Sequence, residues 1–307
     1  MRVLISGSRG FIGKALLAKL IGDGHNTLKA VHTNPDEHDL VIDYDKALLR
    51  KNGGDSGDGV TEDDHFDAVI NLAGEPITAS RWDAQKQTKL YDSRIATTNI
   101  LGNLIQSTNN KPSVFISASA VGYYGSRQEE ILTETSDKGS GFLADLCEAW
   151  EKTALSFQTE TVRVVTLRMG VVLGQNGGLL KSVLPMFKNG VAGRLGSGQQ
   201  WMSWVSLDDA IRAILFLLET EAVSGPVNVT APEPVRNADM TNILSHLLNK
   251  PAHLHMPQLA LELAMGKRTT SEFVLASQRV LPEKLTEAGF DFHYPDVQSS
   301  LAHILQL

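Results

Sequence analysis

The sequence predicts an α/β fold, in which a doubly wound parallel sheet carries helices on both faces and a smaller C-terminal lobe follows. The first observation is an apolar strand at residues 3–6 that runs directly into a helical pattern. The second is the alternation of strand-like and helix-like stretches through the first half of the chain. The third is that several of these strands are apolar on both faces, which is typical of parallel strands covered by helices on either side.

The turn after the first strand carries glycines at three-residue intervals, before a helix predicted at residues 14–20. Such glycines allow a tight turn, a close approach of a pyrophosphate to the backbone and close packing of the helix on the strand. The amides and the dipole of the helix N-terminus then face the anion. The pattern predicts a Rossmann-type dinucleotide site. Its expected cofactor contacts are Gly7, Ser8, Arg9, Gly10, Phe11, Ile12 and Gly13.

The following elements continue the alternation. Strands are predicted at residues 27–32, 39–44, 66–74, 113–119, 163–167 and 226–230, and helices at 83–108, 141–151, 179–188 and 207–218. A glycine-rich, acidic stretch at residues 52–64 is predicted as a mobile surface loop. The helix with apolar residues from 211 to 218 has too little polar surface to lie exposed, so we expect it to be buried against the sheet.

The pattern changes after residue 173, where glycines become dense, above all at residues 190–198. Residues 1–173 are expected to form the NAD(P)-binding Rossmann domain, to which residues 205–230 return. Residues 174–204 and 231–307 are expected to form the substrate-side lobe, with a small C-terminal module from about residue 255. Trp201 and Trp204 are candidates for an aromatic rim or for core, and Arg194 either pairs with an anionic substrate group or lies on the surface.

The end of the second strand decides which cofactor is expected. NAD sites place an acidic residue there, whereas the 2′-phosphate of NADP is repelled by a carboxylate. This chain has His32, Thr33 and Asn34 at that point, and Arg9 lies within reach from the glycine turn. The sequence therefore favours NADP over NAD, although NAD stays possible. Asp43, at the end of the third strand, is a candidate contact to the adenine edge or the N-cap of a helix from residue 46.

The composition argues against several classes of function. The chain has 307 residues and a net charge of −7, which argues against binding to nucleic acid. No apolar run reaches the about 20 residues that a membrane span requires, and the strand-like start predicts no signal peptide. Cys147 is the single cysteine, which argues against a disulfide or a cysteine-rich zinc site and favours the reducing cytoplasm. The histidines lack metal-ligand spacing, so we expect no metal. The expected partner is a small-molecule substrate.

Two segments at strand ends make a family resemblance specific: residues 71–75, Asn-Leu-Ala-Gly-Glu, and residues 117–125, which run from Ser117 to Gly125. With residues 81–82, 93–94, 167–174 and 200–205, and a C-terminal segment from 281 to 290, they extend the likeness over nearly the whole chain. The sequence resembles an extended, atypical short-chain dehydrogenase/reductase of the epimerase-like (nucleoside-diphosphate-sugar epimerase) branch. The C-terminal segment resembles a small domain of unknown function that accompanies this branch.

The resemblance implies roles for residues that match the family's motifs. Ser119 matches a serine that orients and protonates a substrate oxygen. Ala73 and Gly74 match a small pair beside the cofactor, where a larger side chain would obstruct the dinucleotide. Further contacts to the cofactor are expected from Leu72, Arg94 and Ser117.

The Tyr-x-x-x-Lys pair of this family is missing. A tyrosine and a lysine one turn apart share a helix face, where the lysine lowers the phenol pKa from about 10. In the helix at residues 141–151, Phe142 with Leu146 or Leu143 with Cys147 would stand at these positions. We expect other groups to supply acid–base chemistry, and the candidates are Ser119, Tyr123, Tyr124 and Glu75, with Lys89 or Arg94 as a source of positive charge.

Two functions follow from this resemblance. The first is an NADP(H)-dependent oxidoreductase or epimerase that acts on a small carbonyl or nucleotide-sugar-like substrate. The second is a catalytically impaired NADP(H) sensor that acts through a protein partner, for example in cell division. We expect a monomer or a homodimer, because the helices at 83–108 and 141–160 occupy positions where relatives often dimerise.

Overall fold

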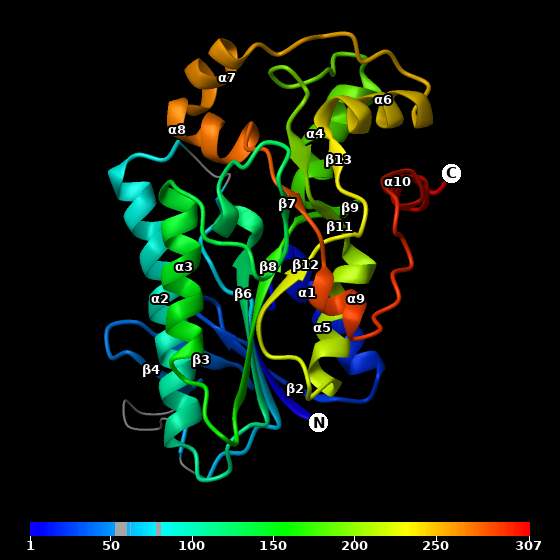
Figure 1. Cartoon of the computed structure of the whole chain (residues 1–307). Coiled ribbons are helices and arrows are strands. Elements are labelled where there is room, and N and C mark those ends of the chain that lie inside the picture. Colours follow the sequence, from blue (N-terminus) through cyan, green and yellow to red (C-terminus); the bar gives the residue numbers. More distant parts are fainter. Residues whose placement is uncertain (53–59, 62, 78–80) are drawn as a thin grey trace.

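An eight-stranded sheet forms the centre of the protein (Figure 1). The computed structural model describes residues 1–52, 60–61, 63–77 and 81–307. The strand order is β12-β8-β6-β5-β1-β2-β3-β4, and all neighbours are parallel except β3 and β4. The strands are β1 (Arg2–Ser6), β2 (Asn26–Val31), β3 (Leu40–Asp43), β4 (Leu48–Lys51), β5 (Ala68–Asn71), β6 (Val114–Ala120), β8 (Arg163–Met169) and β12 (Gly225–Val229).

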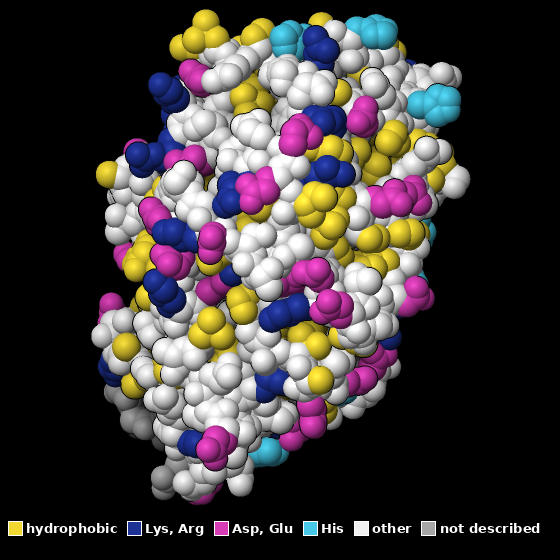
Figure 2. All heavy atoms as spheres, viewed as in Figure 1, with side chains coloured by type: hydrophobic (Ala, Val, Ile, Leu, Met, Phe, Trp, Pro, Cys, Tyr) yellow, Lys and Arg dark blue, Asp and Glu magenta, His cyan; other side chains and the backbone are white. Residues whose placement is uncertain are grey.

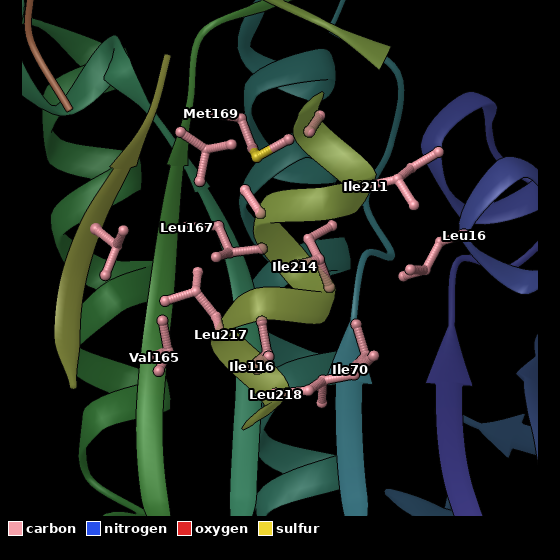
Figure 3. Packing of buried hydrophobic residues seen from close by; sticks show 14 of the residues in the cluster. Leu16, Ile70, Ile116, Val165, Leu167, Met169, Ile211, Ile214, Leu217 and Leu218 are labelled. Carbon is pink, nitrogen blue, oxygen red and sulfur yellow. The ribbon is translucent and has the colours of Figure 1, made fainter. Parts of the chain in front are cut away.

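Helices cover both faces of this sheet, as the sequence predicts. Helices α1 (Phe11–Gly22) and α5 (Leu207–Glu219) pack on one face, and α2 (Ala84–Ser107) and α3 (Phe142–Leu155) on the other. Successive residues of a strand point to opposite faces, so Val3 and Ile5 join the core under α1 and α5 while Leu4 joins the other core. Figure 3 shows Ile214 and Leu217 of α5 lying over the sheet, which confirms the predicted burial of this helix.

The remaining elements are mostly short. They are the 3-10 turn η1 (Val121–Tyr124), β7 (Ile131–Leu132), β9 (Val171–Gly174), α4 (Gly178–Lys188), β10 (Trp201–Met202), β11 (Trp204–Ser206), β13 (Val235–Arg236), α6 (Asn237–Leu247), α7 (Gln258–Met265), α8 (Lys267–Thr269), the π-helical turn η2 (Thr270–Val274), β14 (Arg279–Val280), α9 (Glu283–Glu287) and α10 (Val297–Leu305). In Figure 1, α4, α6 and α7 form a lobe beyond the carboxyl ends of β6 and β8. Trp204 is fully buried within this lobe, so it belongs to the core.

The structure differs from the sequence-based prediction in two places. The chain turns after Asp43 and returns as β4, antiparallel to β3, so the helix considered from residue 46 is wrong. Part of the C-terminal segment reaches the main sheet, because Leu285 and Phe290 join its core, whereas Val297 and Leu301 of α10 pack with α4 and α6. Most of the predicted acidic loop, residues 53–59 and 62, lies outside the described residues. Within the described part of the chain, no helix is long and apolar enough to cross a membrane.

Candidate functional site

The glycine turn between β1 and α1 has the geometry of a dinucleotide cradle. Gly7 has φ +71°, and a Cβ atom on it would lie 2.5 Å from the main chain of Leu72. A Cβ atom on Gly13 would lie 2.1 Å from the carbonyl oxygen of Gly7. Both positions therefore require glycine. The N-cap residue of α1 is Gly10, which has no side chain to cap the helix, and among the described residues no side chain accepts a hydrogen bond from the first-turn amides, so these stay open to an anion.

The side chains of Ser8 and Phe11 lie in the same turn and have different environments. The hydroxyl of Ser8 is buried and has no hydrogen-bond partner among the described residues. A buried hydroxyl without a hydrogen-bond partner destabilises the folded protein, so the Ser8 hydroxyl is suited to bind a ligand group that supplies the missing partner. The ring of Phe11 packs against Gly174 and Gly177, where an added Cβ atom would collide with it. Phe11 therefore offers a bound group its main-chain amide, while its ring fixes the turn against β9.

Arg9 reaches the end of β2, as the sequence predicts. Its guanidinium donates hydrogen bonds to the carbonyl oxygens of Thr33 and Asn34. No acid directly follows β2, but Asp39, which precedes β3, lies 3.4 Å from the Arg9 guanidinium and brings a carboxylate close to this strand end. Lys29 balances this charge at 2.9 Å from Asp39.

The same group of charges is anchored by a second acid. Lys29 also contacts Asp36 at 2.6 Å, and this hydrogen bond raises the pKa of Lys29 and lowers that of Asp36. The two cations and the two carboxylates of this cluster offset one another. A 2′-phosphate would therefore have to share Arg9 with Asp39.

The other residues predicted at the adenine end lie close together. His32 and Thr33 are exposed after β2, and the ring of His32 packs edge-on against Tyr44 at 4.8 Å between ring centroids. The carboxylate of Asp43 accepts the main-chain N–H of Lys46 at 3.0 Å. It thereby holds the turn between β3 and β4, where the sequence analysis considered a helix cap.

A buried amide organises the end of β5. Asn71 accepts a hydrogen bond from the Ser6 hydroxyl at 2.7 Å and donates to Thr98 at 2.9 Å and to Ser117 at 3.3 Å. Ser117, predicted as a cofactor contact, is fully buried, and its hydroxyl helps to position Asn71. The amide of Ala73 donates to Asn71 at 3.2 Å and thereby fixes the loop that follows β5.

Arg94 of α2 lies against this loop, beside Gly74. A Cβ atom on Gly74 would lie 3.2 Å from the Arg94 guanidinium carbon. The guanidinium donates to the carbonyl oxygens of Leu90 at 3.0 Å and Glu75 at 3.3 Å, and it lies 5.0 Å from the ring centroid of Trp150. Burial lowers its pKa. Among the described residues it has no carboxylate partner within 4 Å, so a positive charge is left over beside Gly74.

Glu75 forms an ion pair that the sequence did not predict. Lys86, about two turns before Arg94 on α2, donates to the Glu75 carboxylate at 2.6 Å. The Lys86 side chain is only 6% exposed whereas that of Glu75 is 36% exposed, so the carboxylate is the accessible member of the pair. Glu75 therefore remains available to a ligand, with a buried cation behind it.

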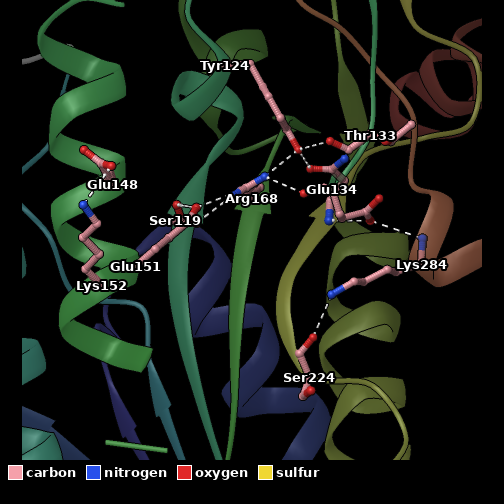
Figure 4. Close-up of polar contacts among 11 residues, drawn as sticks. Ser119, Tyr124, Thr133, Glu134, Glu148, Glu151, Lys152, Arg168, Ser224 and Lys284 are labelled. Carbon is pink, nitrogen blue, oxygen red and sulfur yellow. Dashed lines mark hydrogen bonds and ion pairs between the residues drawn. The ribbon is translucent and has the colours of Figure 1, made fainter. Parts of the chain in front are cut away.

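Ser119 is part of a buried polar chain (Figure 4). Its hydroxyl donates to Glu151 of α3 at 2.7 Å, and Arg168 of β8 binds both oxygens of the same carboxylate at 2.9 and 2.8 Å. All three side chains are almost completely buried. Although burial opposes its charge, the bonds to Glu151 raise the pKa of Arg168. In this arrangement the proton of the Ser119 hydroxyl is directed to the Glu151 carboxylate.

Tyr124 extends this chain away from Ser119. Its hydroxyl accepts from Arg168 at 2.9 Å and donates to Asn228 at 2.7 Å, and its side chain is fully buried. Burial raises the pKa of Tyr124 to about 12. Tyr123 is different: it is partly exposed, and its ring lies 3.5 Å below the Arg168 guanidinium. Of the two tyrosines, Tyr123 is the one that keeps access to a ligand.

The helix positions of the missing tyrosine and lysine are apolar. Phe142 and Leu143 stand in the first turn of α3, where Leu146 and Cys147 follow one turn later and are buried. Burial raises the pKa of the Cys147 thiol to about 12, so it is no acid–base group at neutral pH. The carboxylate of Glu272, from η2, accepts the N–H of Leu143 at 3.1 Å and caps the helix.

The sequence matches a known family along most of its length. The family model described as "NAD dependent epimerase/dehydratase family" matches residues 3–230. The chain belongs to this family. The domain of unknown function DUF1731 matches residues 256–304, in agreement with the predicted branch and its C-terminal domain.

Individual relatives agree with this assignment. The Epimerase family protein ML0860 of Mycobacterium leprae is 37% identical over 98% of this chain and 94% of its own length. The structure of the human epimerase family protein SDR39U1 with NADPH has a TM-score of 0.89 and 28% identity, covering 100% of this chain and 99% of that one. A nucleoside-diphosphate sugar epimerase from Corynebacterium glutamicum has a TM-score of 0.78 and 33% identity, covering 99% of this chain and 58% of that one.

Sequence reasoning missed several of the charged groups. Glu151 lies on the same helix face as Leu143 and Cys147, at steps of four residues, and this spacing is the signal that could have found it. Lys86 and Asp39 offer no such signal, because their partners lie on other elements. Within the described residues no group of three or more histidine, cysteine or acidic side chains could hold a metal ion.

Proposed function

We propose that the protein binds NADP(H) and uses it as an oxidoreductase or epimerase on a small carbonyl or nucleotide-sugar-like substrate. The observation that carries the proposal is the glycine cradle, in which Gly7 and Gly13 have no room for a side chain and the α1 N-terminus is uncapped. The unpartnered hydroxyl of Ser8 fits the same bound group. The NADPH in the human neighbour supports the choice of dinucleotide.

The residues present fit a bound dinucleotide along its length. The first-turn amides of α1 would hold the pyrophosphate, and Arg9 and Thr33 lie at the end where a 2′-phosphate would be. Because Gly74 has no side chain, the guanidinium of Arg94 beside it stays uncovered on this side. This guanidinium would face the nicotinamide half of the dinucleotide. When bound, the nicotinamide supplies or accepts a hydride, and a carbonyl reduction then requires a proton at the substrate oxygen.

We infer that Glu75 and Tyr123 are the groups nearest to acid–base work. Glu75 is the exposed member of its pair with Lys86, and Tyr123 is partly exposed beside Arg168. Ser119 and Tyr124 support the site from within the buried chain and position the end of β6. The unbalanced charge of Arg94 takes over part of the electrostatic work of a lysine.

A direct test is NADPH consumption in the presence of a panel of small aldehydes, ketones and nucleotide sugars. We expect turnover that falls at least tenfold in Glu75→Gln or Tyr123→Phe, while Glu148→Gln, on the far side of α3, retains full activity. The name of the relative from Corynebacterium supports nucleotide sugars as the first members of the panel. Turnover that neither substitution changes would contradict the assigned roles.

One observation favours a second function, an NADP(H)-dependent regulator. The hydroxyl of Ser119 is bound to Glu151, and the positions of the tyrosine and lysine on α3 are apolar. If the protein binds NADPH tightly but turns over no substrate of the panel, this second function is favoured, and the protein would act through a partner. Capture of a protein partner only in the presence of NADPH would then support it.

A further inference from the structure

A hollow of about 260 Å³ lies in the C-terminal lobe, between α6 and the segment that precedes α7. Three basic side chains, Arg194, His253 and His255, take part in its lining, and none of its lining residues is acidic. The complete lining is Arg194, Ala238, Thr241, Asn242, Ala252, His253, Leu254 and His255. In Figure 2 histidine side chains gather at the end of the molecule where Figure 1 places α6 and α7.

The basic side chains are brought together by two extended segments that run side by side. The N–H of Leu254 donates to Ala192 at 3.2 Å, and the N–H of Met256 donates to Arg194 at 3.0 Å. Leu195 is paired with Met256 in a parallel bridge. Since side chains alternate along paired segments, the preceding residues, Arg194 and His255, come to lie on one side.

This close approach of the two segments depends on a glycine. A Cβ atom on Gly193 would lie 1.2 Å from the carbonyl oxygen of Leu254, so no other residue fits there. The ring of His255 is held in place by its Nε2, which lies 2.7 Å from the carbonyl oxygen of Gly196. Fixed backbone geometry therefore brings the three exposed side chains Arg194, His253 and His255 to the same hollow.

Arg194 supplies a charge that the protein itself does not use. Among the described residues it takes part in no ion pair within 4 Å, whereas Arg236 nearby is paired with Glu129. A guanidinium presents its donors in a fork that matches the oxygens of a phosphate. The N-terminal half of α6 contributes Ala238 and Thr241 to the wall, and the positive end of its dipole adds to the field. Asp239, also in this turn, is exposed and does not line the hollow.

We propose that this hollow is a second anion site, which binds the phosphate group of a small phosphate monoester. Its volume lies below the about 300–1,000 Å³ typical of sites for drug-sized ligands, so it suits a small phosphorylated molecule and not a dinucleotide. Arg194 binds the phosphate oxygens, and the imidazole rings of His253 and His255 provide further hydrogen bonds. The proposal does not depend on the function of the glycine cradle.

The test uses proton NMR of the histidine rings during titration with glycerol 3-phosphate and, separately, with inorganic phosphate. The resonances of His253 and His255 are assigned from His253→Gln and His255→Gln. We expect both to shift and to saturate, while the resonance of His246, which lies on α6 but does not line the hollow, stays in place. Glycerol 3-phosphate is expected to saturate the site at a concentration no higher than inorganic phosphate.

Matched variants identify the contact. Arg194→Gln should weaken binding of glycerol 3-phosphate at least tenfold, and Lys188→Gln, an exposed cation of the same lobe, less than twofold. NADPH binding, measured on the same samples, should be equal in both variants and the parent. Shifts that do not saturate, that are equal for His246, or that Arg194→Gln and Lys188→Gln change alike would overturn the proposal. If NADPH does not bind while these shifts occur, the proposed function fails and the second site stands.

Discussion

Replacement of Glu151 by glutamine should destabilise the protein strongly, because it leaves a buried cation without its counterion. The side chains of Arg168 and Glu151 are 3% and 5% exposed and lie 2.8 Å apart. Glutamine retains an oxygen for Ser119 or for one guanidinium N–H but carries no charge. Arg168 would then remain buried beside the ring of Tyr123 with its charge uncompensated.

The size of the effect follows from the burial of the pair. Removing one partner of a buried ion pair costs about 3–5 kcal/mol. An unfolding entropy of about 2.1 cal/mol/K per residue gives about 0.64 kcal/mol/K for a chain of 307 residues. Glu151→Gln should therefore lower Tm by about 5–8 °C.

Thermal unfolding followed by circular dichroism checks this value. Glu148→Gln is the matched control, since Glu148 lies on the same helix and pairs with Lys138 and Lys152 at the surface. It should shift Tm much less. The double variant Glu151→Gln/Arg168→Met should lose less stability than the two single variants added together, because no charge is then left alone. Equal Tm values for Glu151→Gln and Glu148→Gln would refute the assigned role of the pair.

Four further results are expected. Ser8→Ala should leave the unfolding temperature of the free protein unchanged or higher, yet weaken NADPH binding about tenfold by titration, because the hydroxyl has no partner until the ligand supplies one; equal affinity would contradict this. Gly13→Ala should lower Tm and NADPH affinity, since its Cβ would lie 2.1 Å from a carbonyl oxygen, whereas Gly22→Ala, with open space, should do neither. Burial raises the pKa of Glu134, so the protonated carboxyl group favours the folded state at low pH, and this contribution is lost as the pH rises through the folded-state pKa. Glutamine stays neutral at every pH, so the Tm of Glu134→Gln relative to that of the parent should rise between pH 4 and pH 8. A constant difference in Tm would count against this reasoning. Cys147, buried and with its pKa raised to about 12, should react with a thiol reagent at pH 8 only after denaturation.

Local pattern was sufficient to predict the fold and the glycine cradle. The strand, the three glycines and the helix are contiguous, and each has a direct steric or electrostatic reason that can be seen in the sequence. The burial of α5 follows from its apolar periodicity in the same way. The antiparallel β4 was missed because Asp43 and Lys46 fit a helix cap as well as a turn.

The polar groups of the site were harder to predict, since their partners lie far apart in the chain. Ser119 and Glu151 are 32 residues apart, with η1, β7 and most of α3 between them, and the packing of α3 on the sheet brings them together. Asp39 reaches Arg9 across the ends of β1 and β2. Burial also decides between the two tyrosines, because Tyr124 is enclosed and Tyr123 is not, a difference that two adjacent identical residues do not reveal.

Binding of NADPH and NADH to the purified protein tests the central claim most directly, by energy transfer from tryptophan to the nicotinamide. Gly10→Glu places a carboxylate at the start of α1, and its Cβ, 3.2 Å from the nearest atom, can be accommodated by a small shift. Gly22→Glu places the same charge at the other end of the helix, in open space. The account predicts tighter binding of NADPH than NADH, lost in Gly10→Glu and retained in Gly22→Glu. Absence of binding in the parent protein, or equal binding in both variants, would contradict the assignment of the glycine cradle.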